Sequence, residues 1–348
     1  MGVDIWIDLQ HPADVIFFYP LIRQLEDSHS LYITSRRRDE TIKLIDSFGI
    51  NAFPVLRDYS DPVRKSLAVL FRTVQLYTRI PSFRVALCLE LPVAVAVSYL
   101  RKKNSILFLD NDFKLLSKKT ISQELEIKVK KLATRIVIPK VTYSTFVQEY
   151  DAGKLVCYNG YKEHLAISGY TPDADFPEKI PFGDNYVVIR SEAFSAMYVR
   201  PHKESLVPNL VRALTKENIP VLFIPRDEDN TYEIMKYAYS KELIHIPKRP
   251  LNGLDLAYFA KAVLTGSGTM AREAAVLGTP AVSFFPSNQL LSVDMDLIRR
   301  GRMIHSRDVH EIVDYVISMW GKKKEPEFKR AEKVKNEVIS IISELTFS

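Results

Sequence analysis

Short runs of apolar residues alternate with longer amphipathic segments along the whole chain. Continuous apolar runs are typical of strands buried on both faces of a sheet, and apolar residues at helical spacing are typical of amphipathic helices. The runs predict strands at residues 3–8, 31–35, 85–90, 105–109, 135–138, 155–157, 186–189, 221–224, 263–264 and 281–285. The amphipathic segments predict helices at 15–27, 39–48, 61–83, 93–102, 121–132, 203–217, 254–261, 290–300, 309–320 and 326–345. This alternation predicts an α/β protein whose parallel sheets are covered by helices.

A segment without hydrophobic periodicity divides the chain near its middle. Residues 170–185 are rich in Pro and Asp, which is typical of a linker. The chain has 348 residues, a length that suits two domains of ordinary size. We therefore expect an N-terminal domain at 1–169, a linker at 170–185, a C-terminal domain at 186–325 and a charged terminal helix at 326–348.

The stretch 262–285 has the clearest local pattern in the chain. It predicts a strand, a tight turn at 266–268, a helix, a second turn and a buried strand. Gly266 and Gly268 allow the backbone of the first turn to adopt positive φ and to approach a ligand closely. Gly278 stands where a left-handed helix C-cap is expected, and Pro280 prevents the helix from continuing.

The turn and the helix start of this stretch are a candidate anion site. Helix N-termini favour phosphate because their first N–H groups have no partner within the helix. Ser267 or Thr269 can cap the helix. Glu273 lies about one turn further on, where its carboxylate can accept hydrogen bonds from a ribose. In the alternative interpretation the turn is simply a tight strand–helix connection and Glu273 is a solvated residue.

Four residues after predicted strands of the first domain are candidates for acid–base chemistry. His11 follows the first strand and could act as a general base, or it could be a loop histidine that binds backbone. Asp14 follows in the same loop and could instead be a helix N-cap. Asp110 and Asp112 follow the strand at 105–109 and could act as acid or base, or they could form an N-cap or a salt-bridged turn.

Two arginines follow predicted strands of the second domain. Arg190 directly follows the strand at 186–189, and Arg226 follows the strand at 221–224 after one proline. Because ligands of parallel sheets bind beyond the carboxyl ends of the strands, either guanidinium could neutralise a diphosphate. Each could instead be an ordinary salt-bridge partner.

The predicted helix at 61–83 combines an apolar stripe with a basic face. Lys65, Arg72 and Arg79 lie one heptad apart on one side, and the stripe comprises Val63, Leu67, Leu70, Val74 and Tyr77. A basic amphipathic helix can lie on an anionic membrane, so 61–83 is a candidate for peripheral membrane contact. The alternative is a helix packed against its own domain.

Composition excludes few classes of protein or partner. The hydrophobic fraction of 47% and charged fraction of 26% are those of a soluble globular protein, and the net charge of +6 suits a phosphate-bearing partner without requiring one. Cys88 and Cys157 are too few for a disulfide framework. No signal peptide is visible, so we expect a cytoplasmic protein. The modest charge and the lack of a recognition motif argue against nucleic acid as partner.

The glycine-rich stretch resembles the donor-nucleotide motif of the GT-B fold of glycosyltransferases and related enzymes. It is closest to the non-hydrolysing UDP-N-acetylglucosamine 2-epimerases, with matching residues Ser267, Gly268, Glu273, Ala274, Leu277, Gly278 and Pro280. The resemblance implies that the Ser-Gly backbone holds a diphosphate and that Glu273 holds the ribose. Thr269 replaces a glycine of that motif and Arg272 replaces its first glutamate.

Nearly the whole chain resembles a prokaryotic family of unknown function with a predicted GT-B fold. The resemblance rests on IWIDLQHP, YNGYKEHLAIS, VVIRSEAFSAMY and GSGTMAREAAVLGTP. It implies two Rossmann-like domains facing a central cleft, a terminal helix that packs back on the first domain, and no metal. This chain departs from the family's Asn-Pro-Pro-His-Val-His loop, because His11 replaces the Asn and Asp14 replaces the first His.

These observations lead to a nucleotide-sugar-dependent glycosyltransferase as the expected function. The donor, expected to be UDP-linked, would bind in the cleft to Arg190, Arg226, Gly266, Ser267, Gly268, Thr269 and Glu273. The acid–base groups would be His11, Asp14, Asp110 and Asp112, and no separate cofactor is expected. An epimerase-like enzyme and a non-catalytic nucleotide-sugar-binding protein are the alternatives. The sequence does not identify the acceptor or the oligomeric state.

Overall fold

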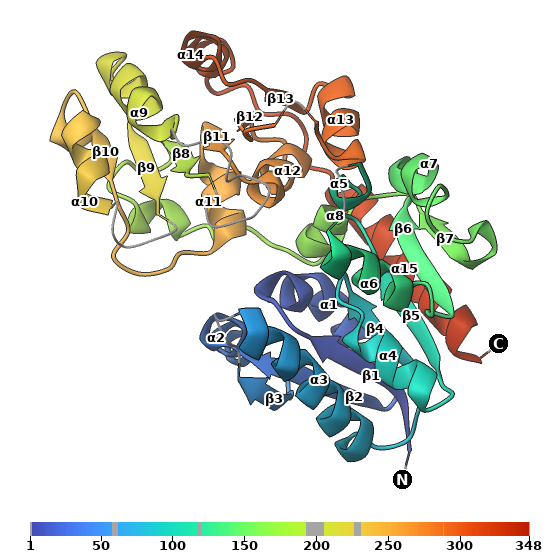
Figure 1. The fold of residues 1–348 in the computed structure, drawn as a ribbon. Coiled ribbons are helices and arrows are strands. Elements are labelled where there is room, and N and C mark those ends of the chain that lie inside the picture. The colour runs from blue at the N-terminus through green and yellow to red at the C-terminus, as the bar shows by residue number, and fades with distance from the viewer. Residues whose placement is uncertain are drawn as a thin grey trace. The chain divides into compact units, whose positions relative to one another are not determined.

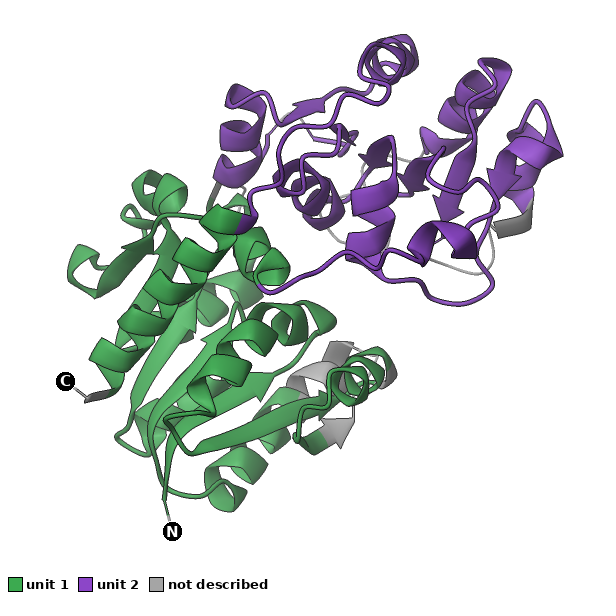
Figure 2. Cartoon of the chain, turned by 180° about the vertical axis from the view of Figure 1, so that it is seen from behind, with its two compact units in different colours: residues 1–168, 329–348 green, residues 169–328 purple. Residues whose placement is uncertain are grey.

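The chain folds into two compact α/β units. The computed structural model describes residues 2–57, 62–116, 120–192, 205–225, 231–287 and 289–347. Unit 1 comprises Met1–Ser168 and Lys329–Ser348, and unit 2 comprises Gly169–Phe328 (Figure 2). Each unit contains a parallel sheet with helices on its faces (Figure 1). The expected fold class, two Rossmann-like parallel-sheet domains, is therefore confirmed.

Unit 1 is built on a seven-stranded sheet in the order β3-β2-β1-β4-β5-β6-β7. The strands are β1 (Val3–Leu9), β2 (Leu31–Arg37), β3 (Phe53–Arg57), β4 (Phe83–Leu89), β5 (Asn104–Phe108), β6 (Arg135–Pro139) and β7 (Leu155–Tyr158). The helices are α1 (Pro12–Leu25), α2 (Asp39–Ser47), α3 (Pro62–Arg79), α4 (Val93–Leu100), α5 (Phe113–Leu116), α6 (Ile121–Lys130), α7 (Tyr143–Phe146), α8 (Lys162–Ile167) and α15 (Phe328–Phe347).

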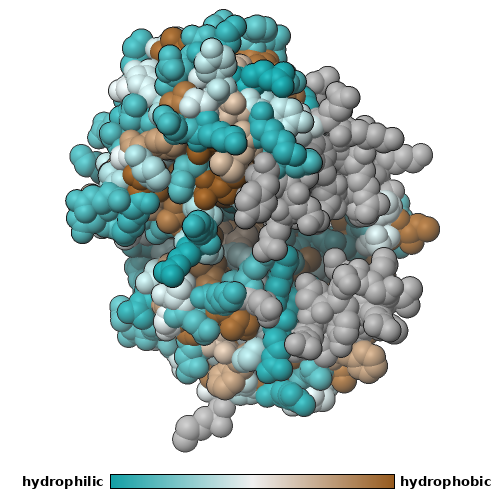
Figure 3. Space-filling view, turned by 90° about the vertical axis from the view of Figure 1, so that its left-hand side faces the viewer, coloured by the Kyte–Doolittle hydropathy of each residue, from teal (hydrophilic) through white to brown (hydrophobic). Residues whose placement is uncertain are grey.

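Alternate residues of the unit 1 strands supply two separate cores. Ile5, Ile7 and Leu9 of β1 pack with α1, α8 and α15 on one face of the sheet. Trp6, between them, packs with α3, α4 and α6 on the other face. This is the period-2 alternation of a strand buried on both sides. On the side of the molecule shown in Figure 3, hydrophobic residues also reach the surface among hydrophilic ones.

Unit 2 is built on a six-stranded sheet in the order β10-β9-β8-β11-β12-β13. The strands are β8 (Val187–Arg190), β9 (Val221–Ile224), β10 (Ile244–His245), β11 (Ala262–Thr265), β12 (Ala281–Ser283) and β13 (Met303–His305). The helices are α9 (Val207–Lys216), α10 (Thr231–Ile234), α11 (Gly253–Phe259), α12 (Gly268–Val276), α13 (Ser292–Arg299) and α14 (Val309–Ser318). Side chains of α9 and α14 pack together against one face of this sheet.

The strand order reverses once in each sheet. In unit 1 the chain runs from β1 outward to β3 and then returns to β4, on the other side of β1. In unit 2 it runs from β8 outward to β10 and returns to β11 on the other side of β8. Ligands of parallel sheets bind at such switch points, beyond the carboxyl ends of the strands. The loops after β1, β4, β8 and β11 are therefore the places to examine.

The predicted element pattern was incomplete at the sheet edges. No strand was predicted for β3, β10 or β13, which lie at the edges of the two sheets. β10 has two residues and β13 has three, which is too short for a periodic signal, and β3 carries a proline and the half-exposed Phe53. The predicted helix at 61–83 is also too long, because α3 ends at Arg79 and Phe83 already begins β4.

Gly278 ends α12 as the sequence predicted. Its φ is +82°, and its N–H donates to the carbonyl of Ala275 (3.2 Å). A Cβ at this position would lie 2.0 Å from the carbonyl oxygen of Lys324, whose own N–H donates to the carbonyl of Gly278 (2.8 Å). Gly278 is therefore required both by its backbone conformation and by the close approach of the segment around Lys324.

We predict that Gly278→Ala destabilises unit 2 more than Gly321→Ala does. Both glycines have positive φ, but a Cβ at Gly321 meets no atom within 4 Å. Gly321→Ala should cost about 1–2 kcal/mol, the price of a left-handed residue. Gly278→Ala should cost at least about 2 kcal/mol more, because the Lys324 backbone must move. Urea unfolding of the two variants tests this, and equal losses would contradict the steric argument.

Candidate functional site

The loop after β1 is held by a buried carboxylate. One oxygen of Asp14, Oδ2, accepts the backbone N–H groups of Gln10 (2.7 Å) and His11 (3.1 Å). Asp14 is only 3% exposed, whereas His11, the N-cap residue of α1, is partly exposed. The structure places both predicted residues at the unit 1 switch point, with His11 as the N-cap residue of α1 and Asp14, which was itself the N-cap candidate, in the first turn of that helix. Asp14 shapes the loop, and His11 is the residue that a ligand can reach.

Asp14 titrates far from its ordinary range. Burial raises the pKa of its carboxyl to about 7, against the opposing effect of the N–H groups of Gln10 and His11. The negative charges of Asp8 and Glu90 raise this pKa further. A carboxyl that titrates near neutrality at a switch point is a feature of functional sites, although structural networks also produce it.

A cation lies beside His11. The Nδ1 atom of His11 is 3.4 Å from a guanidinium nitrogen of Arg38, which follows β2. Because arginine only donates hydrogen bonds, this contact makes Nδ1 an acceptor, and the ring proton of neutral His11 then lies on Nε2. The geometry leaves Nε2 of His11 as a hydrogen-bond donor in this state.

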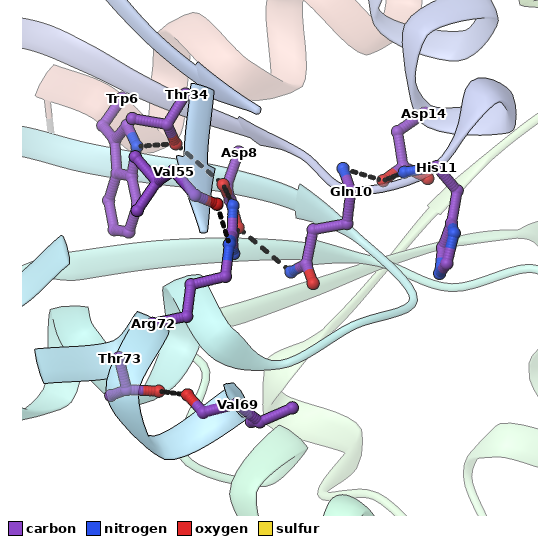
Figure 4. Close-up of polar contacts among 10 residues, drawn as sticks. All are labelled: Trp6, Asp8, Gln10, His11, Asp14, Thr34, Val55, Val69, Arg72 and Thr73. Atoms are coloured by element: carbon purple, nitrogen blue, oxygen red, sulfur yellow. Dashed lines mark hydrogen bonds and ion pairs between the residues drawn. The ribbon is translucent and has the colours of Figure 1, made fainter. Parts of the chain in front are cut away.

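Beneath the loop, Asp8 and Arg72 form a buried bidentate ion pair (Figure 4). Arg72 donates to Asp8 through Nη2 (2.6 Å to Oδ1) and Nη1 (2.8 Å to Oδ2), and the two side chains are 3% and 0% exposed. The hydroxyl of Thr34 and the side-chain amide of Gln10 also donate to Asp8 (2.7 and 3.0 Å). Trp6 Nε1 donates to Thr34 (2.9 Å). The pair therefore joins α3 to β1, β2 and the His11 loop.

This contact corrects one expectation. Arg72 was predicted to lie on a basic outer face of the helix at 61–83, together with Lys65 and Arg79, but it points into unit 1. The reason is Asp8, a buried carboxylate that requires a cation. Helical periodicity alone could not reveal this partner, which lies 64 positions away in the sequence.

Glu90, directly after β4, was missed by the sequence analysis. Its Oε1 accepts the backbone N–H groups of Asp110 (2.9 Å) and Asn111 (3.1 Å), and its φ is +60°. Its Oε2 lies 3.5 Å from Nζ of the buried Lys130. The signal was available, because Glu90 is the first polar residue after a continuous apolar strand.

The two predicted aspartates after β5 have different surroundings. Asp110 makes an ion pair with Lys162 (2.7 Å), which belongs to the YNGYKEHLAIS motif and begins α8. Asp112 is fully buried, and its carbonyl accepts the N–H of Leu115 (3.0 Å) in α5. In the described parts of the chain, no three His, Cys, Asp or Glu residues are grouped closely enough to bind a metal.

In unit 2 the strand register places Arg190 beside the glycine-rich turn. Arg190 of β8 pairs with Thr265 of β11, and the N–H of Gly266 donates to the carbonyl of Arg190 (3.2 Å). The N–H of Ser267 donates to the hydroxyl of Thr265 (2.9 Å). The predicted nucleotide-binding residues Arg190 and Gly266–Thr269 therefore lie together at the unit 2 switch point.

The glycines of this turn are needed for space rather than for positive φ. Neither Gly266 nor Gly268 has positive φ, so that expectation was wrong. A Cβ on Gly266 would lie 2.8 Å from Cα of Glu192, whose buried carboxylate accepts the N–H of Leu206 at the start of α9 (3.0 Å). Glu192 thus fixes the neighbouring loop, and Gly266 allows the two backbones to meet.

Gly268 leaves room for an arginine. A Cβ there would lie 2.6 Å from Nη1 of Arg272, which is buried and paired with Asp294 of α13 (3.1 Å). Ser267 is the N-cap residue of α12, but its hydroxyl does not cap the helix. Glu273, the predicted ribose ligand, is partly buried in the same helix. Arg226 lies outside the described residues.

The fold and the two switch-point sites define a GT-B-like protein. The chain belongs to a family described as "Protein of unknown function (DUF354)", whose model matches residues 3–345. It is 26% identical over 351 residues to an uncharacterized protein of Methanocaldococcus jannaschii, with 93% of each chain covered. The expected family membership is thereby confirmed.

Solved structures support the fold assignment. The chain resembles the UDP-GlcNAc 2-epimerase of Neisseria meningitidis bound to UDP-GlcNAc, with a TM-score of 0.68, 13% identity and full coverage of both chains. It also resembles the UDP-GlcNAc 2-epimerase of M. jannaschii in complex with UDP-GlcNAc and UDP, with a TM-score of 0.71, 15% identity and full coverage of both. A glycosyltransferase of kitacinnamycin matches with a TM-score of 0.61 and 11% identity over 99% of this chain and all of that one. At these identities the likeness concerns the fold.

We predict that breaking the Asp8–Arg72 pair destabilises unit 1 strongly. Arg72→Met or Asp8→Asn leaves one buried group without its partner, which should cost about 3–5 kcal/mol. The double variant should lose less than the sum of the two, because neither charge remains. Chemical unfolding of the three variants measures this coupling.

Arg23→Met is the matched control for these variants. Arg23 pairs with Glu26 at 3.4 Å on the surface of α1, so its loss should cost less than about 1 kcal/mol. Additive losses at Asp8 and Arg72 would contradict the coupling.

We predict a pH-dependent stability difference between the wild type and Asp14→Asn. The folded pKa of Asp14, about 7, lies above its unfolded value of 3.8. Below pH 3.8 the Asp14 carboxyl is protonated in both the folded and the unfolded state, so its ionisation costs no stability. As the pH rises through 4–7, ionising the buried carboxyl should cost wild type a few kcal/mol, and this cost is constant at higher pH.

The amide of Asp14→Asn still accepts both N–H groups but cannot ionise. Asp14→Asn should therefore gain stability relative to wild type between pH 4 and 8, as measured by urea unfolding across that range. If the unfolding free energies of the two proteins change with pH in parallel, the pKa of Asp14 is not raised.

Proposed function

We propose that this protein binds a nucleotide sugar, UDP-linked, and uses it as the donor of a metal-independent glycosyl transfer. The observation that carries the proposal is the arrangement at the β8/β11 switch point. There Arg190 lies directly beside the Gly266–Thr269 turn, which opens α12. A cation beside a helix N-terminus is suited to a diphosphate.

The proposed roles follow from the positions of the residues. The N–H groups of Gly268 and Thr269, in the first turn of α12, bind the diphosphate together with the hydroxyl of Ser267, which is not used as a helix cap. Gly266 permits the tight packing of the turn. Glu273, farther along α12, binds the ribose. Arg190 neutralises the phosphates, and Arg226 remains a candidate for the same role.

Unit 1 supplies the acid–base groups in this proposal. His11 is the candidate acid–base group, because it is the partly exposed group of its loop, and with its proton on Nε2 it can donate to a substrate oxygen. Asp110 is the second candidate; it is buried in its ion pair with Lys162, so contact with substrate requires that pair to open. Asp14 and Asp112 are buried, so they act by shaping the loops that carry the others.

Epimerisation is the second candidate function. It requires an acid and a base at the sugar, and the loops after β1 and β5 carry His11 and Asp110 as the candidates. The named activity of the epimerases with the same fold adds support. A non-catalytic nucleotide-sugar-binding protein remains the third alternative, since the His11 loop departs from the family pattern. Membrane contact through 61–83 is a separate proposal.

We predict that one nucleoside diphosphate raises the melting temperature of the wild type. UDP, GDP, CDP and TDP and their common sugars are compared at equal concentration. A ligand at 100 times its Kd stabilises the native state by about 2.7 kcal/mol. Glu273→Ala should weaken or abolish this shift, because the ribose loses its acceptor.

Glu242→Ala is the matched control for this experiment. Glu242 is an exposed glutamate of unit 2, remote in sequence from the turn, so its variant should keep the full shift. No shift with any nucleotide, or an equal loss in both variants, would overturn the donor site. For the nucleotide that binds, release of free nucleoside diphosphate indicates transfer or hydrolysis, and exchange of the sugar C2 proton with solvent deuterium indicates epimerisation. If the nucleotide binds but neither reaction is observed, the protein is the non-catalytic nucleotide-sugar-binding protein of the third alternative.

A further inference from the structure

Helix α3 presents hydrophobic side chains to solvent. Leu70, Phe71 and Val74 are 64%, 62% and 60% exposed, and Tyr77 is 43% exposed. Scattered exposed apolar residues are normal, but four within two turns of one helix form a patch. Leu70, Val74 and Tyr77 belong to the apolar stripe predicted for the helix at 61–83, and they face outward rather than into unit 1.

The orientation of this helix is fixed from its inner side. Arg72 is locked to Asp8, and Leu76 and Ile80 are buried in the core of unit 1. At about 100° per residue these three positions share one side of α3. Leu70, Phe71 and Val74 must then point away from the sheet. The exposed patch is therefore a built feature of the fold.

The neighbouring helix extends the patch. Helices α3 and α4 cover the same face of the unit 1 sheet (Figure 1). Arg101, which follows α4, donates to the carbonyl of Ile80 (3.0 Å), and its guanidinium lies 5.9 Å from the ring centre of Tyr77. Tyr99 and Leu100 at the end of α4 are 60% and 58% exposed. We call Leu70, Phe71, Val74, Tyr77, Tyr99 and Leu100 the α3/α4 surface.

The positive charge of the chain is concentrated in the same segment. Residues 62–109 contain eight Lys and Arg residues and a single acid, Glu90, a net charge of +7, of which the buried Arg72 is compensated by Asp8. The whole chain has a net charge of +6, so the remainder is slightly acidic. Arg79, Lys102 and Lys103 are exposed at the ends of α3 and α4. The hydrophobic patch is thus bordered by cations.

We propose that the α3/α4 surface binds the headgroup region of an anionic membrane. Exposed aromatic and aliphatic side chains enter the interface, and the flanking cations attract acidic headgroups. A nucleic-acid partner would account for the charge but not for the hydrophobic patch. A second copy of this chain would bury the hydrophobic patch but would bring like charges together. This inference does not rest on the nucleotide site.

Vesicle flotation tests the proposal with the full chain. Phosphatidylcholine vesicles with and without about one-third phosphatidylglycerol are compared at low salt and at about 0.5 M salt. We expect binding only to the anionic vesicles, weakened by salt. Phe71→Ser with Val74→Ser should lower the partition coefficient at least about tenfold. Lys102→Gln with Lys103→Gln should lower it about 25-fold, at about fivefold per cation.

Ile121→Ser is the matched control, because Ile121 is 87% exposed in unit 1 on α6 and lies outside the patch. It should bind vesicles like wild type. Melting curves and the nucleotide shift should be unchanged in every variant, which separates this test from that of the donor site. Failure of wild type to bind anionic vesicles, or equal weakening by Ile121→Ser, would overturn the proposal. The proposal would also be overturned if the wild type forms a dimer and binds no vesicles, and if Phe71→Ser with Val74→Ser converts that dimer to a monomer.

Discussion

The buried ion pair between Asp8 and Arg72 is the constraint on which the rest of unit 1 depends. A carboxylate placed inside a sheet without a cation would cost more than the fold could tolerate, and the paired charges still carry a large desolvation cost. What the pair provides is a fixed geometry. Because the pair is bidentate, it fixes the rotation of α3, and because Gln10 also donates to Asp8, it fixes the start of the His11 loop. One contact thus sets both a helix and a candidate site.

Two of the loops that follow strands in unit 1 are held in the same way. Asp14 accepts two consecutive backbone N–H groups after β1, and Glu90 accepts two consecutive N–H groups after β5. Each carboxylate replaces the hydrogen bonds that the backbone loses when a strand ends. Unit 2 uses glycine instead. Because Gly266 has no side chain, its backbone can lie against the backbone of Glu192. The loops of unit 1 that are held by carboxylates place acidic groups at the edge of its sheet. The glycine-rich turn of unit 2 places backbone N–H groups at the edge of its sheet. Acid–base chemistry suits the first edge and phosphate binding suits the second.

Much of the fold was predictable because buried parallel strands are continuous apolar runs, and the glycine-rich turn and Gly278 follow from local chain geometry. The side-chain partners were not predictable. Arg72 finds Asp8 across 64 positions, and Arg272 finds Asp294 on another helix, so neither pair leaves a periodic signal. Glu90 was missed although it follows the rule that identified Asp110. Positive φ was wrongly expected at Gly266 and Gly268, because sequence shows that glycine is needed but not whether conformation or space requires it.

The inner and outer faces of α3 are not independent. A helix with Arg72 bound inside must display the residues two positions before and after it, and those are Leu70 and Val74. Leu76 and Ile80 are buried on the same side, so the ion pair and the core together hold this orientation. Replacing a buried ion pair by well-packed apolar residues is often neutral or stabilising, so such a pair is weak evidence of a stabilising role. The role of the pair is positional: from one helix it sets the outward hydrophobic face and supports the His11 loop.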